Sequence, residues 1–401
     1  MIHRLRRRLI LLATMAVLLA IPAATGGVHR MGPTAPAQVL SGLEAAGNAS
    51  IGRDCGYSQP LVAGSRRSLW LFCDTPVYQR RHAAGDRFMW TLERFINGST
   101  AALGPGAAGR APGRLTEVRT PDTGNGLAAP RPHTPSRFLP TPAGLVTLAG
   151  QPCESGGGSY AASWISGVTR IPSSADLLIT FNDYCVLTSM GPRFVHEGFG
   201  LVEYDPTTNT LSNEVRVFTG LDLVGALALG SPIFSGRYLY LFSPVCTVAG
   251  KGACAAGNVS VARVGAMPLD WADPLGYQWW TGGRAGAWTS NAAAAGSVIK
   301  GAAPYAVSVE DFFAAGHRLV LVEQTDISGR FNVYESPTPT GAWVKIQTGR
   351  VPCGPSRGGN LDFCRAIIGH PDLSTRSRLA LSYFDPGASV HGHVMVQDFP
   401  W

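Results

Sequence analysis

One apolar strand pattern recurs five times in this sequence and constrains the fold more than any other feature. Each copy is a short apolar run that ends at a polar, acidic or proline position. Such runs, bounded by Gly, Pro, Asp and Ser, are typical of β-strands and turns, and almost no stretch shows a sustained helical period. The five copies are SLWLFCDT (68–75), DLLITFNDY (176–184), YLYLFSPV (238–245), RLVLVEQT (318–325) and RLALSYFD (378–385).

Each copy follows another apolar strand, and most precede a third, such as MWTLERFI (89–96) in the first repeat. Antiparallel units that recur every 60 to 80 residues or so are typical of propeller blades. We therefore expect an all-β chain in which residues 51–401 form a single five-bladed β-propeller of four-stranded antiparallel blades. One alternative is a sixth, degenerate blade in the long gap between residues 74 and 183, which includes a Gly/Ala/Pro-rich insert at 101–135. Another is a two-sheet β-sandwich, which explains the repeat poorly.

The N-terminus has the layout of a secretory signal. A basic start precedes an apolar stretch of about a dozen residues and then small residues, and this stretch is short for a membrane span. We predict a signal peptide over residues 1–26, an N-terminal segment over 27–50, and an extracellular, monomeric mature chain without a membrane span. An uncleaved membrane anchor is the alternative.

The charge of the chain argues against a nucleic-acid partner. Four arginines lie in the predicted signal, so its removal lowers the formal charge of +7 by four, to about +3. The remaining basic residues are scattered and form no run of five or six.

Eight cysteines behind a secretory signal predict disulfide bonds. Their spacing favours neighbouring partners, and a metal site lacks the expected CxxC or His-rich spacing. The predicted pairs are Cys55–Cys73, Cys153–Cys185, Cys246–Cys254 and Cys353–Cys364.

The first repeat is nearly a mirror image of itself around Gly64. Asp54 and Asp74 are equidistant from this glycine, and so are Cys55 and Cys73. In an antiparallel hairpin each pair would lie directly opposite, with both carboxylates on one face. Two opposed carboxylates need a cation, donors or a shared proton, which is how a general acid/base pair or a metal site is built. The alternative is that one aspartate caps a turn.

The blade pattern predicts which polar residues share one end of the propeller. The first strand of each blade begins, and the second ends, at the same face. Residues assigned to that face, together with all eight cysteines, are Asp54, Asp74, Asp183, His196, Glu197, Glu310, Asp311, Gln324 and His370.

Several of these residues are further candidates for the site. Glu197 could donate a proton from the second blade, or be a solvated loop acid. Glu310 and Asp311 are adjacent on a strand and face opposite ways, and we favour Glu310 as the group that reaches the channel. Asp183 occupies in the second blade the position of Asp74, although the repeat alone could explain this.

Aromatic residues could form platforms for sugar rings, which present C–H groups to π-systems. We select Tyr57 and Trp288 as substrate-binding candidates, whereas Trp279 and Trp280 are expected to close the third blade. The sequence has no G-x-S-x-G elbow, phosphate loop or dinucleotide motif.

At the first repeat the sequence resembles a known family. GRDCGYSQPL…SLWLFCDT is similar to the GRDGGYSxPL…LWLFGDT opening of secreted bacterial proteins grouped as domain of unknown function 4185, and FGLVEYDPTTNTL (199–211) and IIGHPDLS…LALSYF (367–384) agree. Where that pattern has glycine, this chain has Cys55 and Cys73, a paired change that fits the hairpin.

The resemblance implies a glycosidase-like propeller, similar to the arabinanases of glycoside hydrolase family 43, and some of the group are endo-D-arabinanases. It implies that Asp54 and Asp74 are essential. It also implies that His370 coordinates an axial ion, such as calcium, or a water; a satisfied inner-strand histidine is the alternative.

These observations predict a secreted glycoside hydrolase that cleaves a furanoside-containing polysaccharide such as arabinan. Asp54 or Asp74 would act as base or nucleophile and a glutamate from another blade as acid. The alternative is a non-catalytic propeller that binds a cell-wall glycan or a cell-surface partner.

Overall fold

In the computed structural model, most of the residues that the structure describes lie in β-strands. The residues it describes are 28–30, 32–34, 37–39, 49–82, 88–106, 115–118, 135–147, 149–153, 158–172, 174–188, 193–219, 228–250, 253–283, 287–354, 363–388 and 392–401. Helical structure within these ranges is limited to α2 (Pro268–Trp271) and the 3-10 turns η1 (Pro274–Gly276), η2 (Ala292–Ala294) and η3 (Phe313–Ala315). The predicted all-β class is confirmed. The predicted signal over residues 1–26 and much of the insert at 101–135 lie outside the described residues.

No helical segment in these ranges has the length and hydropathy that a membrane crossing requires.

Three antiparallel sheets follow the predicted repeat in chain order. We number the sheets 1 to 5 along the chain. Sheet 2 consists of β10 (Ser159–Arg170), β11 (Leu177–Leu187), β12 (Arg193–Asp205) and β13 (Thr210–Thr219). Sheet 3 consists of β14 (Gly230–Ser235), β15 (Tyr238–Gly250), β16 (Ala253–Gly265), β17 (Gln278–Trp280) and β18 (Trp288–Thr289), and β19 (Ile299–Ala302) also pairs with β16. Sheet 4 contains β20 (Ala306–Asp311), β21 (Leu319–Gln324), β22 (Arg330–Ser336) and β23 (Val344–Arg350).

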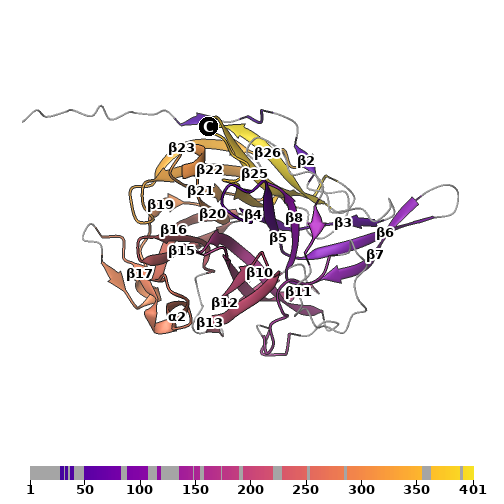
Figure 1. The fold of residues 1–401 in the computed structure, drawn as a ribbon, viewed down its shortest axis with the longest axis horizontal. Helices are drawn as coiled ribbons and strands as arrows, with labels where there is room; N and C mark the ends of the chain where they lie inside the picture. Colours follow the sequence, from indigo (N-terminus) through magenta and orange to yellow (C-terminus); the bar gives the residue numbers. More distant parts are fainter. Residues whose placement is uncertain are drawn as a thin grey trace, which may run out of the picture.

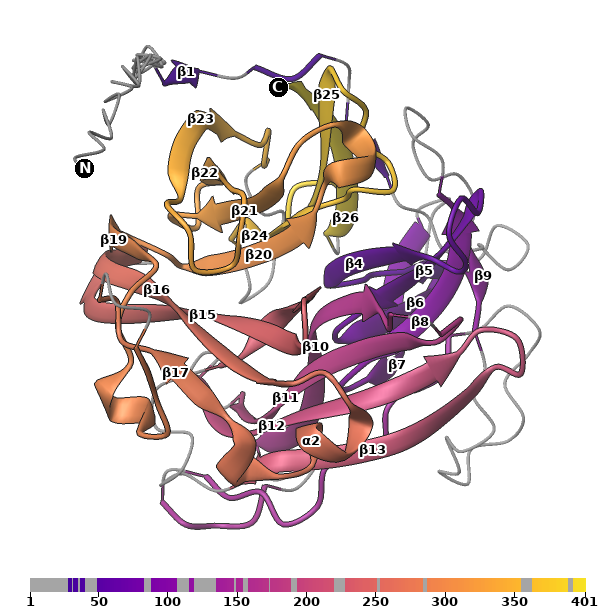
Figure 2. The same ribbon diagram turned by 60° about the vertical axis from the view of Figure 1, so that its left-hand side comes forward.

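The N-terminal segment contributes edge strands to the last two sheets. Sheet 5 is formed by β24 (Arg365–Gly369), β25 (Arg378–Asp385) and β26 (His393–Pro400), and its fourth strand is β2 (Gln38–Val39). A second short strand, β1 (His29–Arg30), pairs in parallel with β23 of sheet 4. Figure 2 shows β1 near the C-terminal end of the chain. Residues from the segment set apart as 27–50 therefore complete sheets built from the far end of the sequence.

Sheet 1 departs from the predicted strand order. It consists of β4 (Cys55–Pro60), β5 (Arg67–Phe72), β8 (Thr100–Pro105) and β9 (Thr116–Glu117). Between β5 and β8 the chain forms the hairpin β6 (Thr75–His82) and β7 (Phe88–Ile96), which pairs with β3 (Ala49–Ile51) as a separate sheet. We call this β3–β6–β7 sheet the arm; in Figure 1 it extends to the right of the other sheets.

The prediction that MWTLERFI forms the third strand of the first repeat is therefore wrong. The third strand is β8, whose residues beside β5 are small. Ala102 lies opposite Trp70, and a Cβ atom added at Gly104 would lie 3.0 Å from the Trp70 ring. Because Trp70 is fully buried, it leaves room only for a neighbouring strand of small side chains.

The first strands of the five sheets contact one another in succession. β4 contacts β10, β10 contacts β14, β14 contacts β20, β20 contacts β24, and β24 contacts β4 again. Figure 1 shows β4, β10 and β20 near the middle of the molecule and β13, β17 and β23 towards its periphery.

Hydrophobic clusters lie between neighbouring sheets, so each sheet is buried on both faces. In β5, Leu69 and Leu71 pack towards sheet 2, whereas Trp70 and Phe72 pack towards sheet 5. The corresponding clusters join sheets 2 and 3, sheets 3 and 4, and sheets 4 and 5. This explains why the repeated runs are continuously apolar and do not alternate with polar residues.

Substitution of Gly56 in sheet 1 should be costly. Its φ is +122°, and an added Cβ would lie 2.9 Å from Cγ1 of Val394 in sheet 5. We expect Gly56→Ala to destabilise the protein by roughly 2 kcal/mol or more, because strain and overpacking add. Gly64→Ala is the matched control, since Gly64 also has a positive φ but no atom within 4 Å of an added Cβ. Urea unfolding measures both, and equal losses of stability would contradict this account of the sheet 1–sheet 5 contact.

Candidate functional site

The β4–β5 hairpin keeps the predicted register over most of its length. Tyr57 pairs with Leu71 and Pro60 with Ser68, so the turn is centred on Gly64 as predicted. At the open end a β-bulge shifts the register by one residue, and Cys55 pairs with Phe72. A bulge adds an unpaired residue and bends its strand. Asp54 and Asp74 are therefore not a directly opposed pair, which corrects the symmetric register.

Glycine and an unusual backbone angle make the bulge possible. Cys55 has φ of +63° and Gly56 has φ of +122°. A positive φ is costly for a residue with a side chain, and the Cys55–Cys73 disulfide, with a Cα–Cα distance of 5.4 Å, joins this strained position to the end of β5. The backbone N–H of Cys73 donates to the Asp54 carbonyl at 3.0 Å, which fixes the two ends of the hairpin together.

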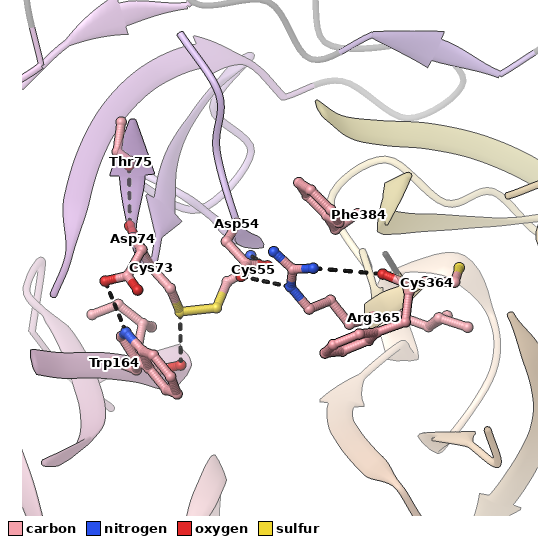
Figure 3. A network of polar contacts seen from close by, with 12 residues as sticks. Asp54, Cys55, Cys73, Asp74, Thr75, Trp164, Cys364, Arg365 and Phe384 are labelled. Atoms are coloured by element: carbon pink, nitrogen blue, oxygen red, sulfur yellow. Dashed lines mark hydrogen bonds and ion pairs between the residues drawn. A yellow bond between two sulfur atoms is a disulfide. The ribbon is translucent and has the colours of Figure 1, made fainter. Parts of the chain in front are cut away.

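The disulfide separates the two aspartate side chains. In Figure 3, Asp54 points towards Arg365 on one side and Asp74 points towards Trp164 on the other. The two carboxyl groups thus belong to one cavity wall but have different partners.

Asp54 is held by an arginine from sheet 5. Nε of Arg365 donates to Oδ2 of Asp54 at 2.7 Å, and the backbone N–H of Cys55 donates to Oδ1 at 2.8 Å. The Arg365 guanidinium lies 3.7 Å from the centre of the Phe384 ring, a cation–π contact that fixes its plane. A charged, hydrogen-bonded pair of this kind sets the orientation of the Asp54 carboxylate.

Asp74 accepts three hydrogen bonds from other elements. Tyr160 Oη donates to Oδ2 at 2.6 Å, Trp164 Nε1 donates to Oδ1 at 3.0 Å, and the backbone N–H of Gly98 donates to Oδ1 at 2.8 Å. Burial raises the pKa of Asp74 from its usual 3.8 to about 6, and the charge of Asp54 adds a smaller rise, although the three donors oppose both effects. Asp74 can therefore take up and release a proton near neutral pH.

Both aspartates line a cavity of about 480 Å³ at the end of the sheets where β4, β20 and β24 begin. Arg365 and the Cys55–Cys73 disulfide also line it. The rest of the wall is rich in aromatic rings: Tyr57, Tyr160, Trp164, Tyr184, Phe194, Phe242, Tyr305 and Phe363. Rings around a few convergent polar groups are typical of a small-molecule or glycan site.

Of the other predicted site residues, Tyr57 lines the cavity. Three further candidates do not line it and contact other parts of the fold: Asp183, Glu197 and Trp288. The Asp183 carboxylate accepts from Ser163 at 2.6 Å and from Arg216 at 2.8 Å. Its neighbours Asn182 and Tyr184 line the cavity, so strand alternation turns Asp183 the other way.

Glu197 and Trp288 also lie outside the cavity lining. Both oxygens of Glu197 accept from the backbone N–H of Val146, at 2.9 and 3.0 Å, so this carboxylate anchors a neighbouring segment. The Trp288 ring packs against the Arg263 guanidinium at 3.9 Å in sheet 3.

Glu310 and His370 lie at the opposite end of the inner strands. β20 and β24 begin beside the cavity, at Ala306 and Arg365, and run about 15 Å away before they reach these two residues. Glu310 lines a second cavity there. The placement of Glu310, Asp311 and His370 on the face of Asp54 is therefore wrong, because Glu310 and Asp311 are the last two residues of β20 and His370 directly follows β24.

His370 contacts sheet 1 at that end. Its Nδ1 lies 2.7 Å from Ser58 Oγ, and burial lowers its pKa to about 3. Among the residues that the structure describes, no group of three or more His, Cys, Asp or Glu side chains is arranged to hold a metal ion. An axial ion at His370 stays a prediction.

The sequence reasoning missed three polar partners in the cavity. Tyr160 and Trp164 lie four residues apart on β10 and face the same way, a period-2 signal that was present in SYAASWIS. Arg365 carries no such signal, since it reaches Asp54 from a segment 311 residues away.

All four predicted disulfides are present: Cys55–Cys73, Cys153–Cys185, Cys246–Cys254 and Cys353–Cys364. Each joins elements close to the cavity end of the sheets.

No family model matches the sequence, and no curated protein matches it. The fold is similar to solved structures. A hydrolase candidate from Bacteroides ovatus shares 14% identity with a TM-score of 0.52, covering 90% of this chain and 87% of that one. A family 117 glycoside hydrolase from Zobellia galactanivorans shares 8% identity with a TM-score of 0.44, covering 91% and 89%. An alpha-L-arabinofuranosidase from Podospora anserina shares 7% identity with a TM-score of 0.43, covering 92% and 96%. The Bacteroides protein establishes a shared overall fold.

The raised pKa of Asp74 predicts a pH-dependent effect of Asp74→Asn. In the wild type, the pKa of Asp74 is about 6 in the folded state and about 3.8 in the unfolded state. Between these two values the folded state binds more protons than the unfolded state. The contribution of Asp74 to the free energy of unfolding therefore falls as pH rises from about 3.8 to about 6. Asparagine does not ionise. We therefore expect the melting temperature of Asp74→Asn, relative to the wild type, to be higher at pH 7.5 than at pH 3.5. A difference that does not change with pH would contradict the assigned pKa.

Because Cys55 has a positive φ, the residue that replaces it should affect the stability of a variant without the Cys55–Cys73 disulfide. Removing the disulfide, which closes an 18-residue separation, should cost about 3 kcal/mol in either double variant. Cys55→Gly/Cys73→Gly should then be more stable than Cys55→Ala/Cys73→Ala by about 1 kcal/mol, because glycine adopts φ of +63° without strain. Denaturant unfolding compares the pair, with Cys246→Ala/Cys254→Ala as the control for loss of a disulfide. Equal stability of the two double variants would refute the strain at Cys55.

Proposed function

We propose that this chain is a secreted glycoside hydrolase built on a five-bladed β-propeller, and that it cleaves a furanoside-containing polysaccharide such as arabinan. One observation carries the proposal: Asp54 and Asp74 flank a disulfide in the wall of an aromatic cavity and have different hydrogen-bond partners.

The contact pattern of the sheets supports the propeller. The succession of first strands returns from β24 to β4, and each pair of neighbouring sheets encloses a hydrophobic cluster. In this arrangement sheets 1 to 5 are the blades, the arm is an insertion in the first blade, and β2 closes the last one. Four disulfides support secretion, because such bonds persist in oxidising compartments.

The partners of the two aspartates suggest a division of roles. Hydrolysis of a glycosidic bond needs one carboxylic acid to protonate the leaving oxygen and one carboxylate to act as base or nucleophile. Asp74, with a pKa of about 6, carries the proton, and Asp54, oriented by Arg365, acts as the carboxylate. This assignment replaces the expected glutamate acid, because neither Glu197 nor Glu310 lines the cavity.

The cavity wall suits a sugar chain. Aromatic rings stack on the C–H faces of sugars, and Tyr57, Trp164 and Tyr184 line the space beside the aspartates. The choice of a furanoside rests on the sequence resemblance to the domain of unknown function 4185 group.

A glycan-binding protein without catalysis is the second candidate. It is favoured by the hydrogen bonds on Asp54, since both of its oxygens already accept a donor. Such a protein would bind the same polysaccharides and release no product.

Substitution of either aspartate separates these functions. The mature chain is first screened on arabinan, arabinogalactan and galactan with product chromatography. Asp54→Asn and Asp74→Asn should each lower turnover by about 10²-fold or more, the contribution of a positioned acid or base. Wild-type turnover should fall as pH rises through about 6, because Asp74 must be protonated to act as the acid.

Glu310→Gln is the matched control, as it removes a carboxyl group outside this cavity and should keep most of the activity. Full activity in both aspartate variants would refute the proposal. If turnover rises as pH rises through about 6, Asp74 acts as the carboxylate and Asp54 as the acid. Glycan binding without any product would favour the glycan-binding protein.

A further inference from the structure

The arm has one face on which aromatic and apolar side chains gather. Phe95 of β7 pairs with Pro76 of β6, and Leu92 pairs with Tyr78. Directly opposite residues in an antiparallel pair project to the same side of the sheet. Residues 76 and 78 are two apart on β6, so Phe95 and Leu92 share one face.

A β-bulge creates this face. Residues three apart on a regular strand project to opposite sides, but the register of β6 and β7 shifts by one residue between Val77 and Tyr78. The shift brings Leu92 and Phe95 together, and Trp90, which pairs with Arg80, follows on the same side. We call the side that carries Tyr78, Trp90, Leu92 and Phe95 the arm face.

The arm face begins at the candidate site. The Phe95 ring packs edge-on against the Tyr160 ring with centroids 5.3 Å apart. Tyr160 lines the cavity and donates its hydroxyl proton to the Asp74 carboxylate at 2.6 Å. One ring–ring contact and one hydrogen bond therefore connect the surface of the arm to the group proposed to carry the catalytic proton.

Large apolar side chains on the arm face are open to solvent. Leu92 is 54% exposed and Phe95 is 41% exposed. The nine residues of β7 extend over roughly 30 Å, a length that several consecutive sugar units would cover. Figure 1 shows β6 and β7 directed away from the sheets that surround the cavity.

We propose that the arm face binds the part of the polysaccharide that extends beyond the cavity. This inference rests on the proposed function and adds a second binding region to it. Sugar rings that leave the cavity past Tyr160 would stack on Phe95 and continue over Leu92 towards Trp90. The arm would thereby favour a polymer over short oligosaccharides that fill only the cavity. Continuity with the cavity selects this occupant over an unrelated protein partner.

Binding to linear arabinan and to its trisaccharide tests the proposal. Both are measured in the Asp74→Asn background, in which cleavage of the polymer should be about 10²-fold slower or more. The Leu92→Ala/Phe95→Ala variant should bind the polymer roughly tenfold more weakly, the expected loss for an aromatic and an aliphatic contact. Its affinity for the trisaccharide should not change. Met89→Ala is the matched control, since Met89 is 57% exposed on the same strand but pairs with Arg81 and projects to the other side.

Leu92→Ala alone is the second variant, because Phe95 contacts Tyr160 and its loss could disturb the cavity. It should weaken polymer binding by about threefold without an effect on the trisaccharide. Polymer affinity equal to that of the Met89→Ala control would overturn the role of the arm, as would a parallel loss for the trisaccharide in the Leu92→Ala variant. The proposed function would survive either result if the wild type still cleaves arabinan. A wild type that neither binds nor cleaves any of the three polysaccharides would end both proposals.

Discussion

The fold depends on sheets that are apolar on both faces. In sheet 1, Leu69 and Leu71 fill the space towards sheet 2 while Trp70 and Phe72 fill the space towards sheet 5. A sheet of this composition cannot leave either face in water, since each buried large side chain contributes roughly 1.5 to 3 kcal/mol of transfer free energy. Each sheet therefore needs two neighbours, and the succession of contacts from β4 to β24 and back to β4 satisfies this for all five. The N-terminal strand β2 adds an outer edge strand to the last sheet by pairing with β26.

Because the faces of the sheets are buried, the polar residues of the site lie at the ends of the strands. Where β4, β20 and β24 begin, side chains no longer pack between sheets and can line the cavity. Asp54 lies just before β4 and Asp74 just after β5, so the hairpin brings them to the same end without any long-range contact. The close approach of Gly56 to Val394 then places Asp54 within reach of Arg365 in sheet 5. The arginine partner of Asp54, which Asp74 lacks, thus depends on a contact between the first and last sheets.

Backbone bulges decide how side chains are grouped at this site. The bulge at Cys55 and Gly56 separates Asp54 and Asp74, which a regular hairpin would set directly opposite. The bulge in β7 places Leu92 and Phe95 on one side of the arm. Neither bulge is encoded by a motif that stands out in the sequence, although glycine at position 56 is compatible with the first. Side-chain direction therefore could not be read from simple alternation at either place.

Local patterns in the sequence determined the β-strands, their turns, the four disulfide pairs and the position of the two aspartates. All of these depend on residues close in the chain, such as the apolar run of β5 or the 18-residue separation of Cys55 and Cys73. Only the tertiary structure decided that β8 and not β7 pairs with β5, that Arg365 reaches Asp54, and that Glu310 and His370 lie at the far end. These outcomes depend on the volume left beside Trp70, on the direction in which each inner strand runs, and on contacts across more than 300 residues. Such relations are set by packing in three dimensions, which no local pattern of residues specifies.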